Sequence, residues 1–277
     1  MPVTITPLGP ATGAEITGLS GHALVDRAVA DEALAALDAY GAVIYREANL
    51  DDDDLVAFSR LLGDVIPLPR GGHQYPEIQK VTRDASQSKL AAYREATFFW
   101  HIDGTTDEVP ARATLLTARQ VSQDGTGDTE FANTYAAYDA LPEEEKRALE
   151  GVRVVHSFAA SQLLVYPDPS PGERAGWDRV PAREHPLVWT RRNGRKSLVI
   201  GATAGEVVGR SAAEGRALLD RVLEWATQPR FTIRHQWHVG DLVIWDNTGM
   251  LHRAQPYGEH STRLMHRTTL AGTEAVR

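Results

Sequence analysis

The apolar positions of the N-terminal region follow two different spacings. Between residues 27 and 40 they recur every three or four positions, as on one face of a helix, and Gly41 follows where helices commonly end. A second helix is predicted from 51 to 62, because its four leading aspartates complement the positive end of a helix dipole. The uninterrupted apolar run at 42–45 predicts a buried strand between the two helices.

Most of the remaining chain consists of short β-type runs separated by turn residues. Asn193-Gly194 predicts a type I′ hairpin, and a second hairpin is predicted around residues 239–241. Proline in a first turn and a capping box predict helices at 142–151 and 211–225. Strands are predicted at 77–82, 113–118, 128–133, 152–158, 185–190, 197–200, 231–237, 242–245 and 263–270.

Two segments have no clear hydrophobic period. Residues 83–96 are polar and rich in alanine, and residues 159–184 contain four prolines, so both are predicted to be active-site loops. The whole pattern, with many short strands, few helices and no βαβ alternation, indicates a mainly β protein with helical decoration. The predicted architecture is a double-stranded β-helix, a jelly roll of the cupin type, formed by residues 1–277 as a single domain.

Composition narrows the possible partners and metals. The net charge of −8 argues against binding to nucleic acid or to an anionic membrane, which leaves a small-molecule substrate as the expected partner. The absence of cysteine excludes disulfides, thiolate metal sites and cysteine nucleophiles. Without a leader-like N-terminus or an apolar run of membrane length, a cytoplasmic protein is expected, and a homo-oligomer remains open.

One short segment and one distant histidine have the donors of a metal site. His101 and Asp103 are two positions apart, so on a strand they would share a face, and His252 could supply a third donor. Two imidazoles and one carboxylate form the facial triad of non-haem Fe(II) oxygenases. An isolated H-x-D pair is common by chance. The run from Trp245 to His252, with Arg263 eleven residues later, strengthens the interpretation.

Arg263 and Thr129 extend this site. A buried arginine is costly unless it meets an anion, and its planar fork binds a carboxylate through two hydrogen bonds. Thr129 follows a glycine-rich turn at the start of a predicted strand, where its hydroxyl could donate to the same carboxylate. Together with the triad, the two residues would hold iron and a small dianionic cosubstrate.

The order of these motifs over nearly the whole chain resembles the taurine dioxygenase/TfdA (TauD/TfdA) family of Fe(II)- and 2-oxoglutarate-dependent dioxygenases. The motifs that carry the resemblance are Ile5-Thr6-Pro7-Leu8-Gly9-Pro10 with Gly13-Ala14 and Ile16-Thr17-Gly18, Trp100-His101-x-Asp103, Gly127-Asp128-Thr129, Trp245-Asp246-Asn247 with His252, and Arg263-Leu264-Met265-His266-Arg267.

The resemblance implies a set of cofactors and roles. His101, Asp103 and His252 would be the catalytic iron ligands, and Arg263 would bind the distal carboxylate of 2-oxoglutarate with help from Thr129. Fe(II) would be the metal cofactor, and 2-oxoglutarate and O2 would be consumed in a reaction that releases succinate and CO2. The expected outcome is hydroxylation of a C–H bond, with desaturation or another oxidation left open. In related halogenases a small residue replaces the carboxylate, so Asp103 favours oxygenation.

The resemblance says less about the substrate. A loose alignment places Leu68, Gly71 and Thr97 where taurine enzymes have His, Tyr and Asn, so a substrate other than taurine is expected. Arg267 matches a position that contacts an anionic substrate group in taurine-type members, although a structural role is equally open. The other substrate contacts predicted are Phe98, Phe99 and His73.

Two other classes of protein could use the same residues. One is a zinc hydrolase or isomerase, because the sequence alone does not distinguish the metals that a His/Asp/His set can bind. The other is a barrel that binds a ligand without turnover. The pair Arg263 and Thr129 favours the oxygenase, since a hydrolase needs no anchor for 2-oxoglutarate.

Overall fold

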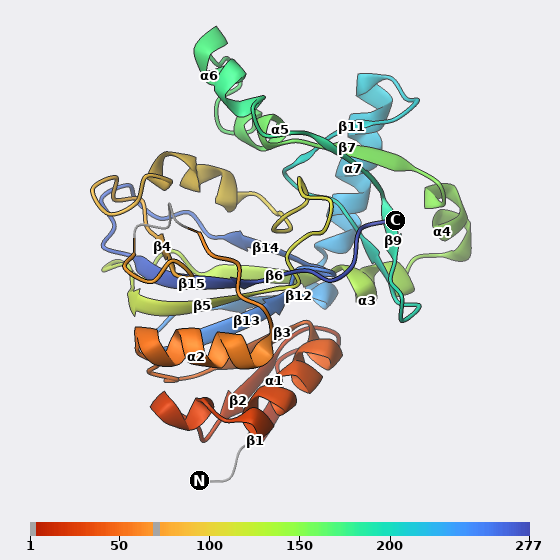
Figure 1. Ribbon diagram of the computed structural model, residues 1–277. Coiled ribbons are helices and arrows are strands. Elements are labelled where there is room, and N and C mark those ends of the chain that lie inside the picture. The colour runs from red at the N-terminus through yellow and green to blue at the C-terminus, as the bar shows by residue number, and fades with distance from the viewer. Residues whose placement is uncertain (1–3, 69–72) are drawn as a thin grey trace.

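The computed structural model describes residues 4–68 and 73–277, so Gly71 lies outside the described residues (Figure 1). The described strands form one large sheet and three smaller ones, which remain separate sheets rather than closing into one barrel. The large sheet has the strand order β1 (Thr4–Pro7), β2 (Ala14–Thr17), β3 (Ala42–Tyr45), β13 (Leu242–Asp246), β5 (Ala113–Gln120), β15 (Leu264–Leu270) and β4 (Gln79–Val81).

A three-stranded antiparallel sheet packs on one face of the large sheet. Its order is β12 (Thr232–His235), β6 (Thr129–Asn133) and β14 (Met250–Ala254). Phe131 of β6 packs against Trp245 of β13, with ring centroids 5.5 Å apart, and Met265 of β15 belongs to the same buried cluster. The two sheets therefore enclose an apolar core between them, because alternate side chains of each strand point inward.

The other face of the large sheet is covered by α1 (Arg27–Tyr40) and α2 (Asp52–Leu62) (Figure 1). The Asp26 carboxylate accepts hydrogen bonds from the first turn of α1, and the helix ends at Gly41 with φ of 73°. Asp51 caps α2 in the same way. Phe58 of α2 packs on Tyr45 of β3 at 6.2 Å between ring centroids, so the sheet is buried on both faces.

The remaining elements lie mostly between residues 134 and 231. No helix in the described ranges is long and apolar enough to cross a bilayer. A further sheet is β11 (Ala204–Val207), β7 (Arg153–His156) and β8 (Arg183–Pro186), and a hairpin is β9 (Val188–Thr190) and β10 (Lys196–Leu198). The helices are α3 (Thr134–Asp139), α4 (Glu143–Leu149), α5 (Phe158–Leu163), α6 (Pro171–Trp177), α7 (Ala212–Ala226), η1 (Gly21–Leu24), η2 (Ala91–Phe98) and η3 (Pro229–Phe231).

The expectation of a β-rich protein decorated with helices is confirmed, but several local predictions are wrong. The 193–194 hairpin exists, yet only Gly194 of its two turn residues has a positive φ, whereas a type I′ turn needs two. The predicted hairpin around 239–241 is absent, because β12 and β13 join different sheets. Alternation along a strand is the same whichever sheet the strand enters, so the sequence pattern could not separate these cases.

The two aperiodic segments also contain more regular structure than loops would. Residues 159–184 include α6 and most of α5, and residues 83–96 include most of the 3-10 helix η2. Ser170 and Glu173 form a capping box at α6, a signal that the four prolines of this segment obscured.

Candidate active site

His101, Asp103 and His252 lie together between the two packed sheets. Their ligand atoms are all within 4.8 Å of one another. The Nε2 atom of His101 is 4.0 Å from Asp103 Oδ1, and that of His252 is 3.6 Å from Asp103 Oδ2. These distances are too long for hydrogen bonds, so the three donors surround a space that a cation could fill.

Backbone pairing brings the two histidines together. His101 N donates to His252 O at 3.0 Å and His252 N donates to His101 O at 2.9 Å, which makes an isolated antiparallel bridge. The prediction that His101 and Asp103 share one strand is wrong, because Asp103 lies in a turn. Gly201 permits this arrangement: a Cβ there would lie 2.6 Å from the carbonyl oxygen of Trp100.

Neighbouring groups fix how the donors point. The Nδ1 atom of His101 lies 2.9 Å from the carbonyl oxygen of Phe99, which accepts its proton and leaves Nε2 with a lone pair. The Oδ2 atom of Asp103 accepts from Thr114 Oγ1 and from Arg267 Nη2, both at 3.0 Å. Such contacts orient a ligand before any metal binds.

The electrostatics of the cluster suit a divalent cation. Burial lowers the pKa of both imidazoles, so His101 and His252 are neutral at neutral pH and can donate lone pairs. Burial by itself would raise the pKa of the Asp103 carboxyl, but the Arg267 guanidinium, together with the neighbouring imidazoles and the Thr114 hydroxyl, holds that pKa well below its usual range. The cluster therefore offers two neutral nitrogens and one anionic oxygen.

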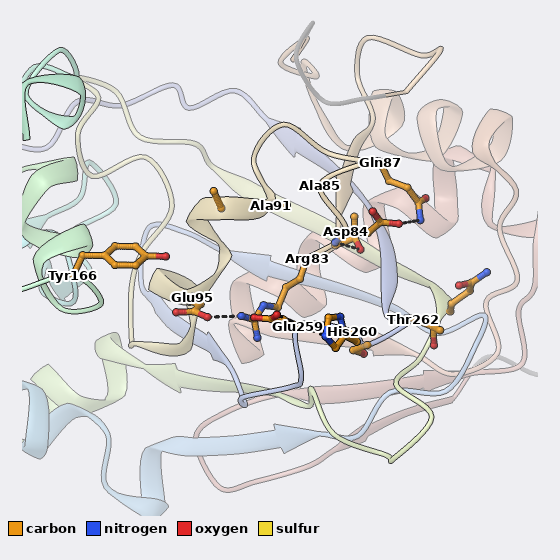
Figure 2. Close-up of a pocket in the computed structure, with 14 residues that line it drawn as sticks. Arg83, Asp84, Ala85, Gln87, Ala91, Glu95, Tyr166, Glu259, His260 and Thr262 are labelled. Carbon is orange, nitrogen blue, oxygen red and sulfur yellow. Dashed lines mark hydrogen bonds and ion pairs between the residues drawn. The ribbon is translucent and has the colours of Figure 1, made fainter. Parts of the chain in front are cut away.

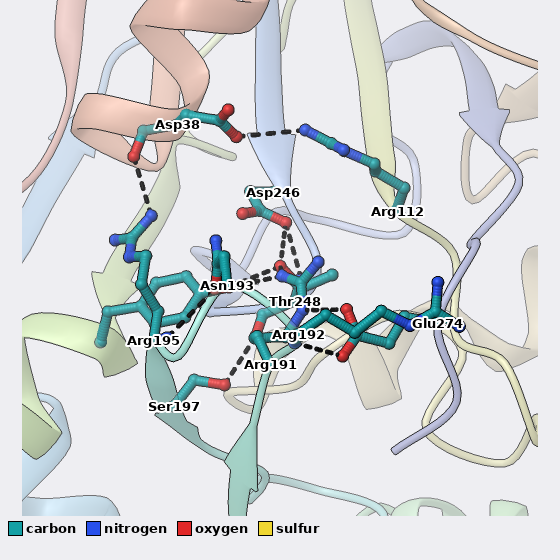
Figure 3. A network of polar contacts seen from close by, with 11 residues as sticks. Asp38, Arg112, Arg191, Arg192, Asn193, Arg195, Ser197, Asp246, Thr248 and Glu274 are labelled. Carbon is teal, nitrogen blue, oxygen red and sulfur yellow. Dashed lines mark hydrogen bonds and ion pairs between the residues drawn. The ribbon is translucent and has the colours of Figure 1, made fainter. Parts of the chain in front are cut away.

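A buried polar network holds the turn that leads to His252 (Figure 3). Asp246 accepts from the backbone N–H of Thr248 at 2.9 Å, and Arg191 donates to the Thr248 hydroxyl and to Tyr135 Oη, the latter at 2.7 Å. A side chain at Gly249 would collide with the Tyr135 ring, with its Cβ only 1.9 Å from a ring carbon. The run around Asp246 thus has a structural role in delivering β14 to the site.

Arg263 and Thr129 lie beside the cluster, in a small cavity of about 50 Å³ that His101 and His252 also line. Arg263 is 3% exposed, its Nε donates to Gly127 O at 3.2 Å, and it makes no ion pair within the described ranges. The Thr129 hydroxyl accepts from Trp237 Nε1 at 2.9 Å, which leaves its own proton for another acceptor. This pair can receive a carboxylate.

A larger cavity of about 480 Å³ opens on the other side of His101 and Asp103. It draws residues from both segments that were predicted to be active-site loops, and Arg267 lines it as well as the smaller cavity. The residues that sequence reasoning missed here come mainly from η2, α5 and the stretch after α6, and include Tyr93, Arg94, Phe158, Gln162 and Val180.

Three predicted substrate contacts lie elsewhere. Phe98 packs edge-on against Tyr257 at 5.5 Å, and the Phe99 side chain is 38% exposed; neither lines the two cavities. His73 binds Asp52 at 3.0 Å and packs on His266, which points away from Arg267 on β15. His73 therefore lies on the outer face of the large sheet and lines neither cavity, and its assignment as a substrate contact stays a prediction.

Two neutral imidazoles, a carboxylate and a nearby buried arginine define a metal-dependent enzyme with an anchor for an anionic ligand. The chain belongs to the "Taurine catabolism dioxygenase TauD, TfdA family", whose model matches residues 4–269. It is therefore a dioxygenase that uses Fe(II), 2-oxoglutarate and O2, and the predicted family and cofactors are confirmed. This membership favours the oxygenase over the zinc hydrolase and the binding protein.

Similar proteins include two 2,4-dichlorophenoxyacetate dioxygenases dependent on alpha-ketoglutarate (2-oxoglutarate). That of Burkholderia sp. (strain RASC) is 36% identical over 254 residues, 85% of this chain and 83% of the relative. That of Cupriavidus pinatubonensis is 35% identical over 287 residues, 97% of this chain and 98% of the relative. The crystal structure of AAD-2 in complex with Mn(II) and N-oxalylglycine is also similar. The match covers 100% of this chain and 100% of that chain, with a TM-score of 0.82 and 31% sequence identity.

Proposed function

We propose that this dioxygenase hydroxylates a C–H bond of a small organic anion other than taurine. The observation that carries the proposal is the apolar-walled cavity that meets the His101, Asp103 and His252 cluster and has Arg267 in its lining. The relatives that act on 2,4-dichlorophenoxyacetate, an aryloxy carboxylate, support a substrate with an apolar body and an acidic group.

The three clustered residues are proposed to hold the iron. Two neutral imidazoles and one carboxylate, with no thiolate available in the chain, fit the preferences of Fe(II) and leave positions open for other ligands. Arg267, through its contact with Asp103 Oδ2, keeps that carboxylate oriented and compensates its charge.

Arg263 and Thr129 are proposed to bind the distal carboxylate of 2-oxoglutarate. Arg263 provides a buried guanidinium with no ion-pair partner among the described residues, and Thr129 donates the proton that its contact with Trp237 leaves free. Apolar side chains in the same cavity, such as Leu116 and Trp245, exclude water from the bound cosubstrate.

When bound, Fe(II) and 2-oxoglutarate supply the oxidising chemistry, in which O2 is consumed, succinate and CO2 are released, and a substrate C–H bond is hydroxylated. The protein positions the substrate relative to the iron ligands. The second cavity holds the substrate beside His101 and Asp103, so the C–H bond nearest the cluster reacts.

An anaerobic titration tests the assignment. Apoprotein is given Fe(II) and then 2-oxoglutarate, and the weak visible charge-transfer band of the chelated keto acid is recorded. The band is expected in the natural protein, absent in Asp103→Ala, and shifted to higher 2-oxoglutarate concentration in Arg263→Met. Iron binding without any band would contradict the proposal. A screen of aryloxy and alkyl carboxylates by succinate release then identifies the substrate.

The jelly-roll architecture and the single-domain organisation are also proposals. We propose that the packed sheets of β13, β5 and β15 and of β12, β6 and β14 are the two layers of a jelly roll, and that residues 1–277 form one catalytic domain. A shared core that includes Phe131, Trp245 and Met265 supports this. A cytoplasmic location and a possible homo-oligomer stay predictions, which fractionation and sedimentation would test.

A further inference from the structure

Three arginines line the two cavities beside the His101, Asp103 and His252 cluster. Two of them, Arg263 and Arg267, already have proposed roles. The third is Arg94 of η2, which lines both cavities and so stands where they meet. Sequence patterns did not single it out, because it lies in a segment without periodicity.

Arg94 is buried without a counter-charge. Only 7% of the residue is exposed, and no acidic side chain in the described ranges comes within ion-pair distance of it. Its Nη2 donates to the carbonyl oxygen of Lys80 at 3.1 Å, while its Nε is buried with no hydrogen-bond partner among the described residues. An unpaired buried cation destabilises a fold, so such a group calls for a ligand.

The surroundings of Arg94 make its buried charge more unfavourable. Burial, followed by repulsion from Arg267, lowers the pKa of Arg94 to about 10, so the group remains charged at neutral pH. Arg267 has Asp103 as a partner at 3.0 Å. Arg94 has no acidic partner among the described residues, so of these two it is the one with hydrogen-bonding capacity left for a ligand.

The net charge of the side chains that line the two cavities also favours an anionic substrate. The charged side chains that line the two cavities are the three arginines and Asp103. An imidazole that binds a metal is neutral, so the two histidines add no charge to the loaded site. Fe(II) and the 2-oxoglutarate dianion cancel each other, so the loaded site retains a positive charge. A substrate with an anionic group would reduce that charge, whereas a neutral substrate would leave it uncompensated.

The cavity around Arg94 is otherwise largely apolar. Tyr93 and Phe158 meet edge to face at 5.4 Å between centroids, and Ile102 and Val180 also line the space. These walls suit an aromatic or alkyl body with an acidic group at the end nearest Arg94.

We propose that Arg94 is a specificity-determining residue that binds the carboxylate of an apolar-bodied organic acid, the substrate of this dioxygenase. The proposal rests on the proposed function and names the group that recognises the anion.

A larger surface hollow is a weaker candidate for a ligand site than the cavity around Arg94. It is an open space of about 680 Å³ lined by residues such as Arg83, Glu95 and Glu259 (Figure 2). Its arginine is already satisfied, because Arg83 pairs with Glu95 and donates to Tyr257 O at 2.7 Å. This hollow does not require a ligand to complete it, but Arg83 provides a matched control for Arg94.

Binding is measured without turnover, by anaerobic calorimetry of the Fe(II) and 2-oxoglutarate complex. The probes are phenoxyacetate, 3-phenylpropionate and octanoate, each paired with its neutral amide. The natural protein is expected to bind at least one acid more tightly than its amide. Arg94→Met should weaken acid binding by about tenfold or more and leave amide binding unchanged. Arg94→Lys should retain part of the preference, and Arg83→Met all of it.

The stability of the metal-free protein provides a second readout. Because Arg94→Met removes an unpaired buried charge, its Tm should rise by about 2–4 °C. A residue with only a structural role would lower the Tm when replaced.

Three outcomes overturn the proposal: no acid is preferred over its amide, the preference survives in Arg94→Met, or the variant loses 2-oxoglutarate affinity while acid binding is unchanged. The charge-transfer band of the natural protein separates these failures from a failure of the proposed function, which would remove the band altogether.

Discussion

Among the described residues, two clusters of two histidines and one aspartate lie on opposite sides of β15. His101, Asp103 and His252 lie on the inner side, where Arg267 of β15 reaches Asp103. The outer cluster consists of Asp52, His73 and His266. His266 and Arg267 are adjacent in the strand, so their side chains point to opposite faces. The two clusters have the same composition and different surroundings.

The outer cluster is closed by hydrogen bonds. Asp52 lies 2.7 Å from His266 Nδ1, 3.0 Å from His73 Nε2 and 2.6 Å from Arg119 Nη2, so its oxygens already have partners. In the inner cluster the corresponding distances between imidazole and carboxylate are 3.6 and 4.0 Å. The comparison shows that composition alone does not make a metal site. The donors must face one another without satisfying one another.

The strongest way to test this difference is to remove each aspartate in turn. Asp103→Ala should abolish tight Fe(II) binding and lower turnover more than about a hundredfold, because a ligand is lost rather than an outer partner. Asp52→Ala should bind one Fe(II) per chain, as the natural protein does. Equilibrium dialysis with iron analysis measures both. Equal loss of iron in the two variants would contradict the comparison.

The second test concerns stability. Asp52→Ala leaves His73, His266 and Arg119 without their shared acceptor, and should lower the free energy of unfolding by about 1–3 kcal/mol. Urea unfolding of the metal-free protein measures the loss. An unchanged midpoint would mean that the outer cluster contributes nothing to the fold.

The pH dependence of stability provides a third test, with a smaller expected effect. Burial lowers the pKa of His266 below its ordinary value of 6.5, so the unfolded chain binds this proton more readily. The folded state should therefore lose stability as the pH falls below about 6.5, by at most about 1.4 kcal/mol per pH unit from this group. His266→Gln should show a flatter dependence between pH 7 and 5. A dependence as steep as that of the natural protein would exclude this residue as a cause.

The smallest effect is expected at His73. His73→Gln removes one of the three partners of Asp52 and should change the free energy of unfolding by less than about 1 kcal/mol. Because His73 lies away from both cavities, kcat/KM for the substrate and for 2-oxoglutarate should stay unchanged. A large rise in KM would restore His73 as a substrate contact.

The sequence predicted the inner cluster because its residues sit in spaced motifs around residues 101–103 and 245–263. It did not place His73 on the outer face of the sheet, since the sequence does not say which face of a sheet a loop reaches. It also failed for Arg94, because the significance of that residue lies in a missing partner, and only a three-dimensional arrangement shows which charges are unpaired.

Helix ends could be predicted from the sequence, whereas the pairing of strands could not. The stop at Gly41 and the capping box at Ser211 and Glu214 each act within one turn of helix and were predicted correctly, whereas the cap at Asp26 was not predicted. The pairing of β13 with β3 and β5 joins residues far apart in the chain, and alternation carries no information about such partners.

The reciprocal backbone bridge between His101 and His252 has a consequence for how the site falls apart. Each of these two amide protons is held by the carbonyl of the other residue. Exchange of either proton with solvent requires the two segments to separate, so both amides should have the same protection factor. That protection measures how readily the two histidine segments of the iron site separate, and it can be measured on the protein alone, without iron, cosubstrate or substrate.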